Sequence, residues 1–472
     1  MRKNLAIYSI FLAVSLTTIS AIAVEIPITV FPLDKYDQNI NNWVKPSDPD
    51  YDAPLIKFSN QKDHLKKYYN RYCATWDHKY VKIALEQELK NKISEQKITS
   101  KYSDSIKIGY AENFRPYSKQ WIKDIIANMN LKQFVLPLKY KANNRGIAVK
   151  NLFARELPTT DPYFYNFSLP GEGYPFDNLQ ESSVWVGTGV YIIGETLDKQ
   201  WYLVLTPHFI AWVQSDGIAK TSKAFIAKWQ KHAKQKLVAI TRTNISVFDN
   251  NNQYRFDAYI GAVFPAIFPS KNSAKNTTSI LIPITNSYHN AQIAFAKLSN
   301  KDAAIMPLEA TPHNFATIIS NLIGRPYGWG NMYFYNDCSA ELQSLYTPFG
   351  IWLPRNSSAQ IKVGKLVDKS SESSQERLKY LMENGKKFMT IIKIDGHIML
   401  YLGSYPNPNS AMHEPITMTY QNKWGLKPSD NSYRAIIGQS VLLPMLPSYP
   451  EDPKLNSLAN EKCFQVSYLE SL

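Results

Sequence analysis

A cysteine at the start of a predicted helix is the residue of this 472-residue sequence best placed to do chemistry. Cys338 follows Asp337, a residue type that caps helices, and apolar residues at i+4 and i+7 continue a helical pattern to about Tyr346. The positive end of a helix and its unpaired N–H groups favour the thiolate form. A buried structural cysteine is the competing interpretation, but the turn-rich residues 324–330 indicate a cleft wall directly before it. The pattern therefore predicts a nucleophilic thiol.

The only histidines after Cys338 are His397 and His413, and a nucleophilic thiol needs an imidazole to accept and return its proton. The alternation of residues 397–402 predicts a strand on which His397 shares a face with Met399. His413, on the next predicted strand, would accept a hydrogen bond from one ring nitrogen of His397 and fix its tautomer. A strand histidine is more often structural, so spacing alone leaves this catalytic triad a hypothesis.

Composition and motifs exclude several classes of function. The chain has three cysteines and no H-E-x-x-H, C-x-x-C, P-loop or Rossmann glycine string, so we expect no metal, no nucleotide and no other cofactor. Lys and Arg outnumber Asp and Glu by 53 to 39, a net charge of +14. No zinc finger, RNA-binding signature or arginine-rich arm accompanies that charge, so nucleic acid is not an expected partner. The charge either attracts anionic envelope polymers or forms an ordinary solvated surface.

The N-terminus has the form of a secretory signal. A basic start at residues 1–3 precedes an apolar run over residues 5–22, and the small residues of 21–23 suit a signal peptidase. We therefore expect residues 1–23 to be removed and the mature chain to begin at Val24, and an uncleaved membrane anchor is the alternative. No later stretch of the sequence is long and apolar enough to span a membrane. The predicted location is periplasmic or extracellular, with no integral membrane segment after signal removal.

The rest of the chain divides into segments of different character. Residues 24–145 indicate an extended lead-in followed by a mainly helical domain. Short strands separated by turn residues predict two consecutive small β-barrels, over residues 146–235 and 236–306. In residues 307–472 helices come first and an antiparallel sheet follows, with Cys338 on the second helix. The predicted fold class is therefore a multidomain α+β protein.

Longer strings around the candidate nucleophile and base carry a family resemblance. Asp-Cys-Ser stands at 337–339, an apolar Gly-His strand at 396–403, and Gly-Ile-Trp-Leu-Pro-Arg-Asn-Ser at 350–357 is followed by Gln360. Together these strings resemble the NlpC family of bacterial cell-wall cysteine peptidases (the P60 hydrolases), whose catalytic domain is papain-like. The chain is also similar to members that have a helical N-terminal domain and tandem bacterial SH3-like barrels, at residues 155–159, 171–177 and 185–188.

The resemblance implies a peptidase for the murein stem peptide. Such an enzyme cuts between the γ-carboxyl of D-glutamate and the amino group of the next diamino acid, with diaminopimelate favoured and lysine left open. A free N-terminal L-Ala is implied as well, because in SH3-containing members the first barrel closes one end of the cleft. Peptidoglycan stem peptides or murein fragments are the implied partners, and we expect a monomer.

The resemblance also assigns residues to the site: the nucleophile, the base and the third polar residue fall on Cys338, His397 and His413. Asp337 and Ser339 stand where the family holds the substrate amine. Tyr327, in the motif before the nucleophile, either lines the same pocket or only packs. Arg355 either meets a stem-peptide carboxylate or forms a surface ion pair.

Two other classes of function are open at this point. One is a binding module with a degenerate catalytic domain, although the intact set of Cys338, His397 and His413 argues against degeneracy. The other is a different reaction on the same thiol fold, such as amide hydrolysis elsewhere, acyl transfer or transpeptidation. Cys73 and Cys463 either form a disulfide in an oxidising compartment or remain separate thiols.

Overall fold

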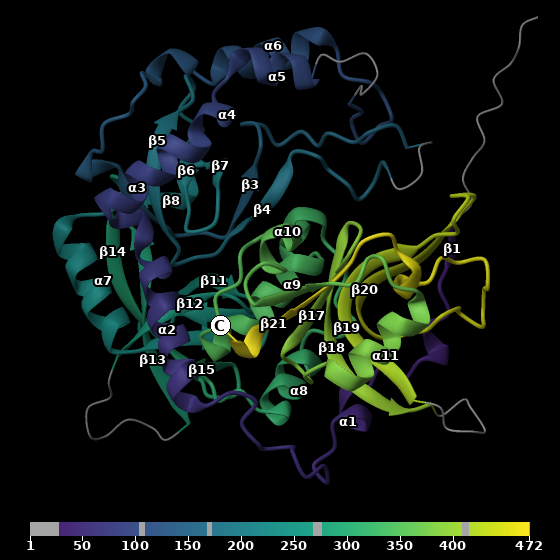
Figure 1. The fold of residues 1–472 in the computed structure, drawn as a ribbon. Helices are drawn as coiled ribbons and strands as arrows, with labels where there is room; N and C mark the ends of the chain where they lie inside the picture. The colour runs from purple at the N-terminus through teal and green to yellow at the C-terminus, as the bar shows by residue number, and fades with distance from the viewer. Residues whose placement is uncertain (1–27, 103–108, 168–171, 268–275, 408–414, 472) are drawn as a thin grey trace, which may run out of the picture.

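The computed structural model describes residues 28–102, 109–167, 172–267, 276–407 and 415–471. The predicted signal segment 1–23 and His413 lie outside these residues. The described chain is a multidomain α+β protein, as predicted, with N-terminal helices, two small β-sheet domains and a larger sheet flanked by helices (Figure 1). None of the helices in the described ranges is long and apolar enough to cross a membrane.

Helices of the N-terminal region lie along both small sheet domains and share their cores, except the first of them, whose Ile40 is buried in one cluster with Phe315 of the C-terminal part. They are α1 (Ile40–Trp43), α2 (Phe58–Tyr72), α3 (His78–Ala84), α4 (Lys90–Lys92), α5 (Glu95–Tyr102) and α6 (Lys119–Asn128). α5 and α6 cover the first small sheet at the top of Figure 1, and α2 runs beside the second. Ile122 of α6 is buried in one cluster with Leu203 of the first sheet, whereas Tyr72 of α2 is buried in another cluster with Phe264 of the second.

The first small sheet has seven antiparallel strands in the order β4-β3-β7-β6-β5-β2-β8. Its strands are β2 (Arg145–Ala148), β3 (Leu152–Arg155), β4 (Gln180–Val184), β5 (Gly189–Glu195), β6 (Trp201–Leu205), β7 (Ile210–Gln214) and β8 (Ile218–Lys220). Because β4 forms one end of this order, its outer side is free to contact the C-terminal part of the chain.

Helix α7 (Lys223–Gln235) leads into the second small sheet, whose strand order is β14-β13-β12-β9-β15. These strands are β9 (Leu237–Ile240), β12 (Val263–Ile267), β13 (Thr277–Thr285), β14 (Ala291–Ser299) and β15 (Ala303–Ile305), and a separate hairpin comprises β10 (Ile245–Phe248) and β11 (Tyr254–Ala258). α7 was not predicted, because residues 223–235 lie where the sequence suggested only the end of one barrel.

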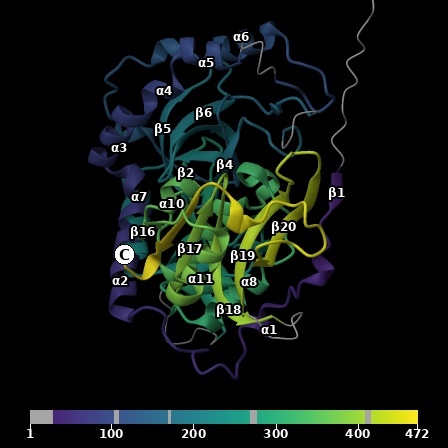
Figure 2. The same ribbon diagram turned by 45° about the vertical axis from the view of Figure 1, so that its right-hand side comes forward.

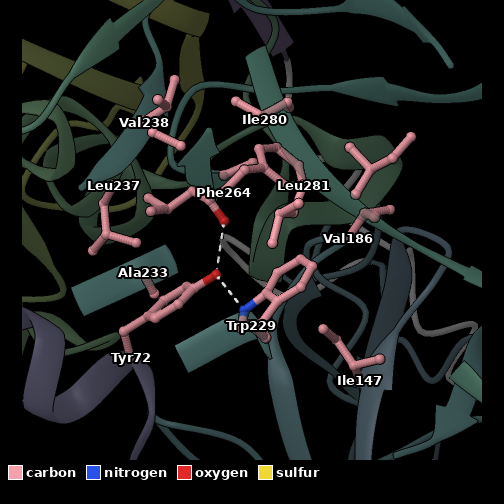
Figure 3. Packing of buried hydrophobic residues seen from close by; sticks show 14 of the residues in the cluster. Tyr72, Ile147, Val186, Trp229, Ala233, Leu237, Val238, Phe264, Ile280 and Leu281 are labelled. Carbon is pink, nitrogen blue, oxygen red and sulfur yellow. Dashed lines mark hydrogen bonds between the residues drawn. The ribbon is translucent and has the colours of Figure 1, made fainter. Parts of the chain in front are cut away.

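A buried hydrogen-bonded pair of aromatic rings joins α2, α7 and the second small sheet (Figure 3). The indole N–H of Trp229 donates to the hydroxyl of Tyr72 at 3.1 Å, and that hydroxyl donates to the carbonyl of Val263 at 3.2 Å. All three polar groups are buried, so each depends on the others for its hydrogen bond.

Tyr72→Phe is expected to lower the free energy of unfolding by about 1–3 kcal/mol, because it leaves a buried indole N–H and a buried carbonyl without partners. Chemical denaturation followed by tryptophan fluorescence measures the change. Tyr288→Phe is the matched control, since the Tyr288 ring is 83% exposed. Equal stability of the two variants would contradict the structure here.

The C-terminal part is built on a seven-stranded sheet with the order β1-β20-β19-β18-β17-β21-β16 (Figure 2). The strands are β1 (Ile28–Val30), β16 (Lys365–Asp368), β17 (Thr390–Ile394), β18 (His397–Pro406), β19 (Pro415–Leu426), β20 (Arg434–Met445) and β21 (Phe464–Tyr468). Its helices are α8 (Pro312–Ser320), α9 (Cys338–Tyr346), α10 (Ser357–Gln360) and α11 (Ser374–Asn384). β1 pairs with β20 in parallel, so residues 28–30, predicted to belong to an N-terminal lead-in, extend the catalytic sheet.

The two faces of this sheet bury different helices. Ile398 and Leu400 pack with α8 and α9, whereas Met399 and Tyr401 pack with α11. This is the alternation predicted for residues 397–402. It places the two candidate catalytic residues where α9 and β18 both begin.

Candidate active site

Cys338 is the first residue of α9 and is only 9% exposed. Its side chain is buried in one cluster with Ile398, the residue after His397 at the start of β18. The N–H of a first helical residue has no partner within its helix. The Cys338 N–H can therefore donate to the oxygen of a carbonyl that the sulfur attacks.

Burial controls the protonation state of this thiol. It raises the pKa of Cys338 to about 11, together with the nearby Asp337 carboxylate, against the opposing effects of the Ile398 N–H, Lys423 and Arg355. The sequence predicted a thiolate stabilised by the helix start, and in the structure desolvation outweighs that effect. At neutral pH the sulfur is therefore a thiol that needs a base close by.

A chain of hydrogen bonds fixes the tautomer of His397. The Thr419 hydroxyl donates to the Leu443 carbonyl at 2.7 Å, so its oxygen is left to accept from Nε2 of Gln421 at 2.9 Å. That contact turns the amide oxygen of Gln421 toward His397, whose Nε2 lies 2.7 Å away. Oxygen accepts and cannot donate, so Nε2 of His397 carries the proton. The other ring nitrogen, Nδ1, is left with a lone pair.

His397 is neutral in this environment. Burial and the positive charge of Lys423 lower the pKa of the imidazole well below its ordinary value, although the hydrogen bond with Gln421 opposes the shift. A neutral imidazole with a free Nδ1 is the form that accepts a proton from a thiol.

Gln421, which the sequence analysis did not single out, takes the orienting position that was predicted for His413. His413 lies outside the described residues, so its role stays a prediction. The signal for Gln421 was present in the sequence as consecutive polar residues, Gln421 and Asn422, inside a stretch otherwise suited to a buried strand.

The carboxylate of Asp337 is fully engaged by its neighbours. One oxygen accepts from the N–H groups of Ser339 and Ala340, at 3.1 and 2.9 Å, which is the N-cap predicted for α9. Arg355 donates to the two oxygens at 3.1 and 2.6 Å. Burial opposes ionisation, but Arg355 and the hydrogen bonds hold the pKa of Asp337 below its ordinary value. Arg355 thus forms a buried pair with Asp337, not a surface ion pair.

A second buried carboxyl group lies behind the nucleophile. Glu341, one turn along α9, accepts hydrogen bonds from Asn336 at 2.7 Å, from Ser440 at 2.6 Å and from the Tyr420 hydroxyl. Asn422 in turn donates to the carbonyl of Asn336 at 2.8 Å. These contacts tie the segment before Cys338 to strands β19 and β20.

Family models match four successive parts of the chain. They describe an N-terminal stabilising domain of NlpC/P60 proteins (residues 5–134), an SH3 domain of SH3b1 type (162–214), an SH3 domain of SH3b2 type (222–268) and the NlpC/P60 family itself (324–429). The last match contains Cys338, His397 and Gln421. The chain belongs to the NlpC/P60 family.

Known proteins share the arrangement or part of the sequence. A solved NlpC/P60 endopeptidase from Photobacterium damselae subsp. piscicida has a TM-score of 0.78 and 27% identity, over 95% of this chain and 99% of that one. The γ-D-glutamyl-L-lysine dipeptidyl-peptidase of Bacillus subtilis (strain 168) is 22% identical over 246 residues, which are 51% of this chain and 74% of that protein. This NlpC/P60 protein is a cysteine peptidase that acts on peptidoglycan peptides, as the motifs implied, and its family acts outside the cytoplasm.

The SH3b1 domain of this NlpC/P60 protein contacts the loop before the nucleophile. The side-chain amide of Gln180 donates to the carbonyl of Gly330 at 2.9 Å. Nε of Arg355 donates to the hydroxyl of Ser182 at 2.6 Å. Because the same guanidinium binds Asp337, strand β4 of the SH3b1 domain is linked directly to the N-cap of α9.

Gly330→Ala is expected to lower kcat/KM by roughly 10²-fold, because it displaces this loop. Gly330 has a φ of +57°, and a Cβ there would lie 2.3 Å from the carbonyl oxygen of Gln180. Its N–H also binds Asp337, at 3.2 Å, so a shift of the loop moves the cap of the nucleophile's helix. Gly324→Ala is the control, since Gly324 also has a positive φ but open space around it. Similar kinetics for both variants would contradict the tight contact.

Tyr327 packs among aromatic side chains close to Cys338. Tyr327 lies close enough to Cys338 and Asp337 to interact with both electrostatically, and burial raises the pKa of its hydroxyl. Its ring centroid is 6.1 Å from that of Trp424, which also meets Phe176 from the segment before β4 at 6.0 Å. Tyr327 therefore packs close to the nucleophile, and its place in the substrate pocket stays a prediction.

The structure thus brings together six of the residues predicted for the site: Cys338, His397, Asp337, Ser339, Tyr327 and Arg355. In the described ranges, no group of three His, Cys, Asp or Glu side chains could hold a metal ion. The cysteines of the described chain are free thiols, so Cys73 and Cys463 are not bridged.

Proposed function

We propose that this NlpC/P60 peptidase hydrolyses the bond between the γ-carboxyl of D-glutamate and the following diamino acid, with Cys338 as nucleophile and His397 as base. The observation that carries the proposal is the hydrogen-bond chain through Thr419 and Gln421, which leaves Nδ1 of His397 unprotonated. Cys338 is buried in one cluster with Ile398, the residue next to His397. The curated relative named for cleavage at γ-D-glutamyl-L-lysine supports the choice of bond.

The first half of the reaction forms a thioester. Nδ1 of His397 takes the proton of the Cys338 thiol as the sulfur attacks the γ-carbonyl carbon. The carbonyl oxygen becomes an oxyanion, which the Cys338 N–H binds. Protonated His397 then gives its proton to the leaving amine as the C–N bond breaks.

The second half restores the thiol. A water molecule attacks the thioester carbon while His397 accepts a water proton. The C–S bond breaks, the proton returns to the sulfur, and the product leaves with a free γ-carboxylate. No step needs a group other than these side chains and water.

We further propose that the substrate carries a free N-terminal L-Ala and that diaminopimelate is the third residue. The hydrogen bonds of β4 with Gly330 and Arg355 support the amine requirement, because an SH3b1 domain held against the loop before the nucleophile would limit the length of the substrate on that side. Asp337 and Ser339 would hold the amine, which must share the Asp337 carboxylate with Arg355.

Three peptides test the bond and the amine requirement. The purified protein is incubated with L-Ala-γ-D-Glu-meso-diaminopimelate, with the same peptide carrying lysine in place of diaminopimelate, and with the N-acetylated form of the first peptide. The products are identified by mass spectrometry. We expect release of free diaminopimelate from the first peptide and much slower cleavage of the acetylated one. Equal cleavage of the acetylated peptide would remove the amine requirement, and a wild-type protein that cuts none of them would remove the proposed bond.

We also propose export with removal of residues 1–23. The basic start and the apolar run that follows support this step. The intact mass of the protein recovered from outside the cytoplasm is expected to correspond to a chain that begins at Val24. A mass that includes Met1 would favour an uncleaved anchor.

A further inference from the structure

Lys423 lies on the face of β19 that carries the orienting residue of the site. Side chains two apart on a strand point to the same side, so Lys423 shares a face with Gln421, the hydrogen-bond partner of His397. Its ammonium acts electrostatically on the Cys338 thiol and on the His397 imidazole. Lys423 is therefore a cation within reach of the reacting groups.

This cation has no carboxylate partner in the described part of the chain. No Asp or Glu oxygen of those residues lies within ion-pairing distance of Lys423, although the side chain is half-buried. Lys92, by contrast, is a mostly buried lysine with carboxylate partners: Glu156 and Glu181 each lie 2.5 Å from its ammonium. Holding a charge in a sheltered site without a partner is unfavourable.

Arg355, another cation of the site, is not available to bind a substrate carboxylate. Its guanidinium already donates hydrogen bonds to Asp337 and Ser182. Of the groups that act on Lys423, Glu461 and the ionised form of Cys338 favour the ammonium, and Lys427 disfavours it. Burial is the largest influence and lowers the pKa of Lys423 to about 8, so the ammonium is present at neutral pH and lost above it.

We propose that Lys423 is a substrate-binding residue whose ammonium pairs with a substrate carboxylate next to the scissile amide. This inference rests on the proposed function, because the stem peptide has a carboxylate on each side of that bond. The α-carboxylate of D-glutamate lies on the acyl side, and the α-carboxylate of the diamino acid lies on the leaving side. Either one supplies the missing partner of the buried charge.

The test compares peptides in which one carboxylate is an amide. The three substrates are L-Ala-γ-D-Glu-meso-diaminopimelate, the same peptide with D-isoglutamine, and the same peptide with the diaminopimelate α-carboxamide. The variants are Lys423→Gln and Lys423→Arg, and Lys427→Gln is the control because it removes an exposed charge just past the end of β19. Thermal unfolding of each variant checks that the fold is kept.

For the wild type we expect one of the two amide peptides to show a kcat/KM roughly 10- to 100-fold below that of the parent peptide, as for loss of a charged hydrogen bond. In Lys423→Gln, the kcat/KM values of the parent peptide and of that amide peptide are expected to become nearly equal. Lys423→Arg is expected to keep most of the difference between the two peptides, and Lys427→Gln is expected to leave the difference unchanged. The amide that is discriminated identifies which carboxylate is bound. The KM of the parent peptide is also expected to rise as pH passes through about 8, where Lys423 loses its proton.

Three outcomes overturn the inference. If Lys423→Gln still cleaves the amide peptide more slowly than the parent peptide, another residue binds the substrate carboxylate. An equal loss on all three peptides means that Lys423 acts only on the thiol and the imidazole. A wild-type enzyme that cleaves the parent and both amides equally well has no carboxylate pocket here, whereas a wild-type enzyme that cleaves none of them removes the proposed function itself.

Discussion

Cys338→Ala is expected to lower kcat/KM on the stem peptide by about 10⁴-fold or more, because it removes the atom that forms the covalent intermediate. Alanine is a good helix former and smaller than cysteine, so α9 and its Asp337 cap should remain in place. The assay is release of free diaminopimelate from L-Ala-γ-D-Glu-meso-diaminopimelate, with thermal unfolding to confirm the fold.

Cys463→Ala is the matched control for this prediction. Cys463 is a partly exposed thiol directly before β21, and its sulfur lies 3.6 Å from the ammonium of Lys393. Its replacement should leave kcat/KM within about twofold of the wild type, as surface changes usually do. Substantial cleavage by Cys338→Ala would exclude this sulfur as the nucleophile.

Gln421→Leu is expected to lower kcat by on the order of 10²-fold with a smaller change in KM, because residues that orient a catalytic imidazole have effects of that size. Without the amide oxygen, nothing in the chain from Thr419 fixes the proton on Nε2 of His397. The base then loses both its orientation and its tautomer. Steady-state kinetics on the same peptide measures both constants.

Two further variants distinguish this role from a packing effect. Gln421→Glu keeps an acceptor and adds a negative charge, which raises the pKa of His397; its activity should be retained near neutral pH while the acid limb of the pH profile moves to higher pH. His413→Ala should leave the kinetics unchanged. If His413→Ala instead causes the loss and Gln421→Leu does not, His413 is the orienting residue that the sequence analysis predicted.

Local signals made the helix and strand of the site predictable. α9 begins at Cys338 and ends at Tyr346, as predicted, because an Asp before a helical apolar pattern defines a helix start without help from distant residues. His397 begins β18 because the alternation of the following residues is equally local. The order of helices and sheets followed from the same kinds of pattern.

The partners of these residues could not be predicted in the same way. Gln421 reaches His397 only because β18 and β19 pair in one particular register, with Leu400 opposite Tyr420. The pairing of Arg355 with Asp337 and Ser182 depends on how the SH3b1 domain docks, which no short stretch of sequence encodes. Strand register and domain docking are properties of the whole fold, so the residues next to Gln421 and Arg355 in the sequence do not reveal their partners.

The guanidinium shared between Ser182 and Asp337 has a consequence for attempts to recombine such enzymes. A graft that moved only the peptidase unit onto another scaffold would leave Arg355 without its SH3b1 contact and Gly330 facing solvent. Arg355, which binds the N-cap residue Asp337, would then lack the hydrogen bond that also holds it to Ser182. The unit that can be transplanted is therefore the peptidase together with its first SH3b domain.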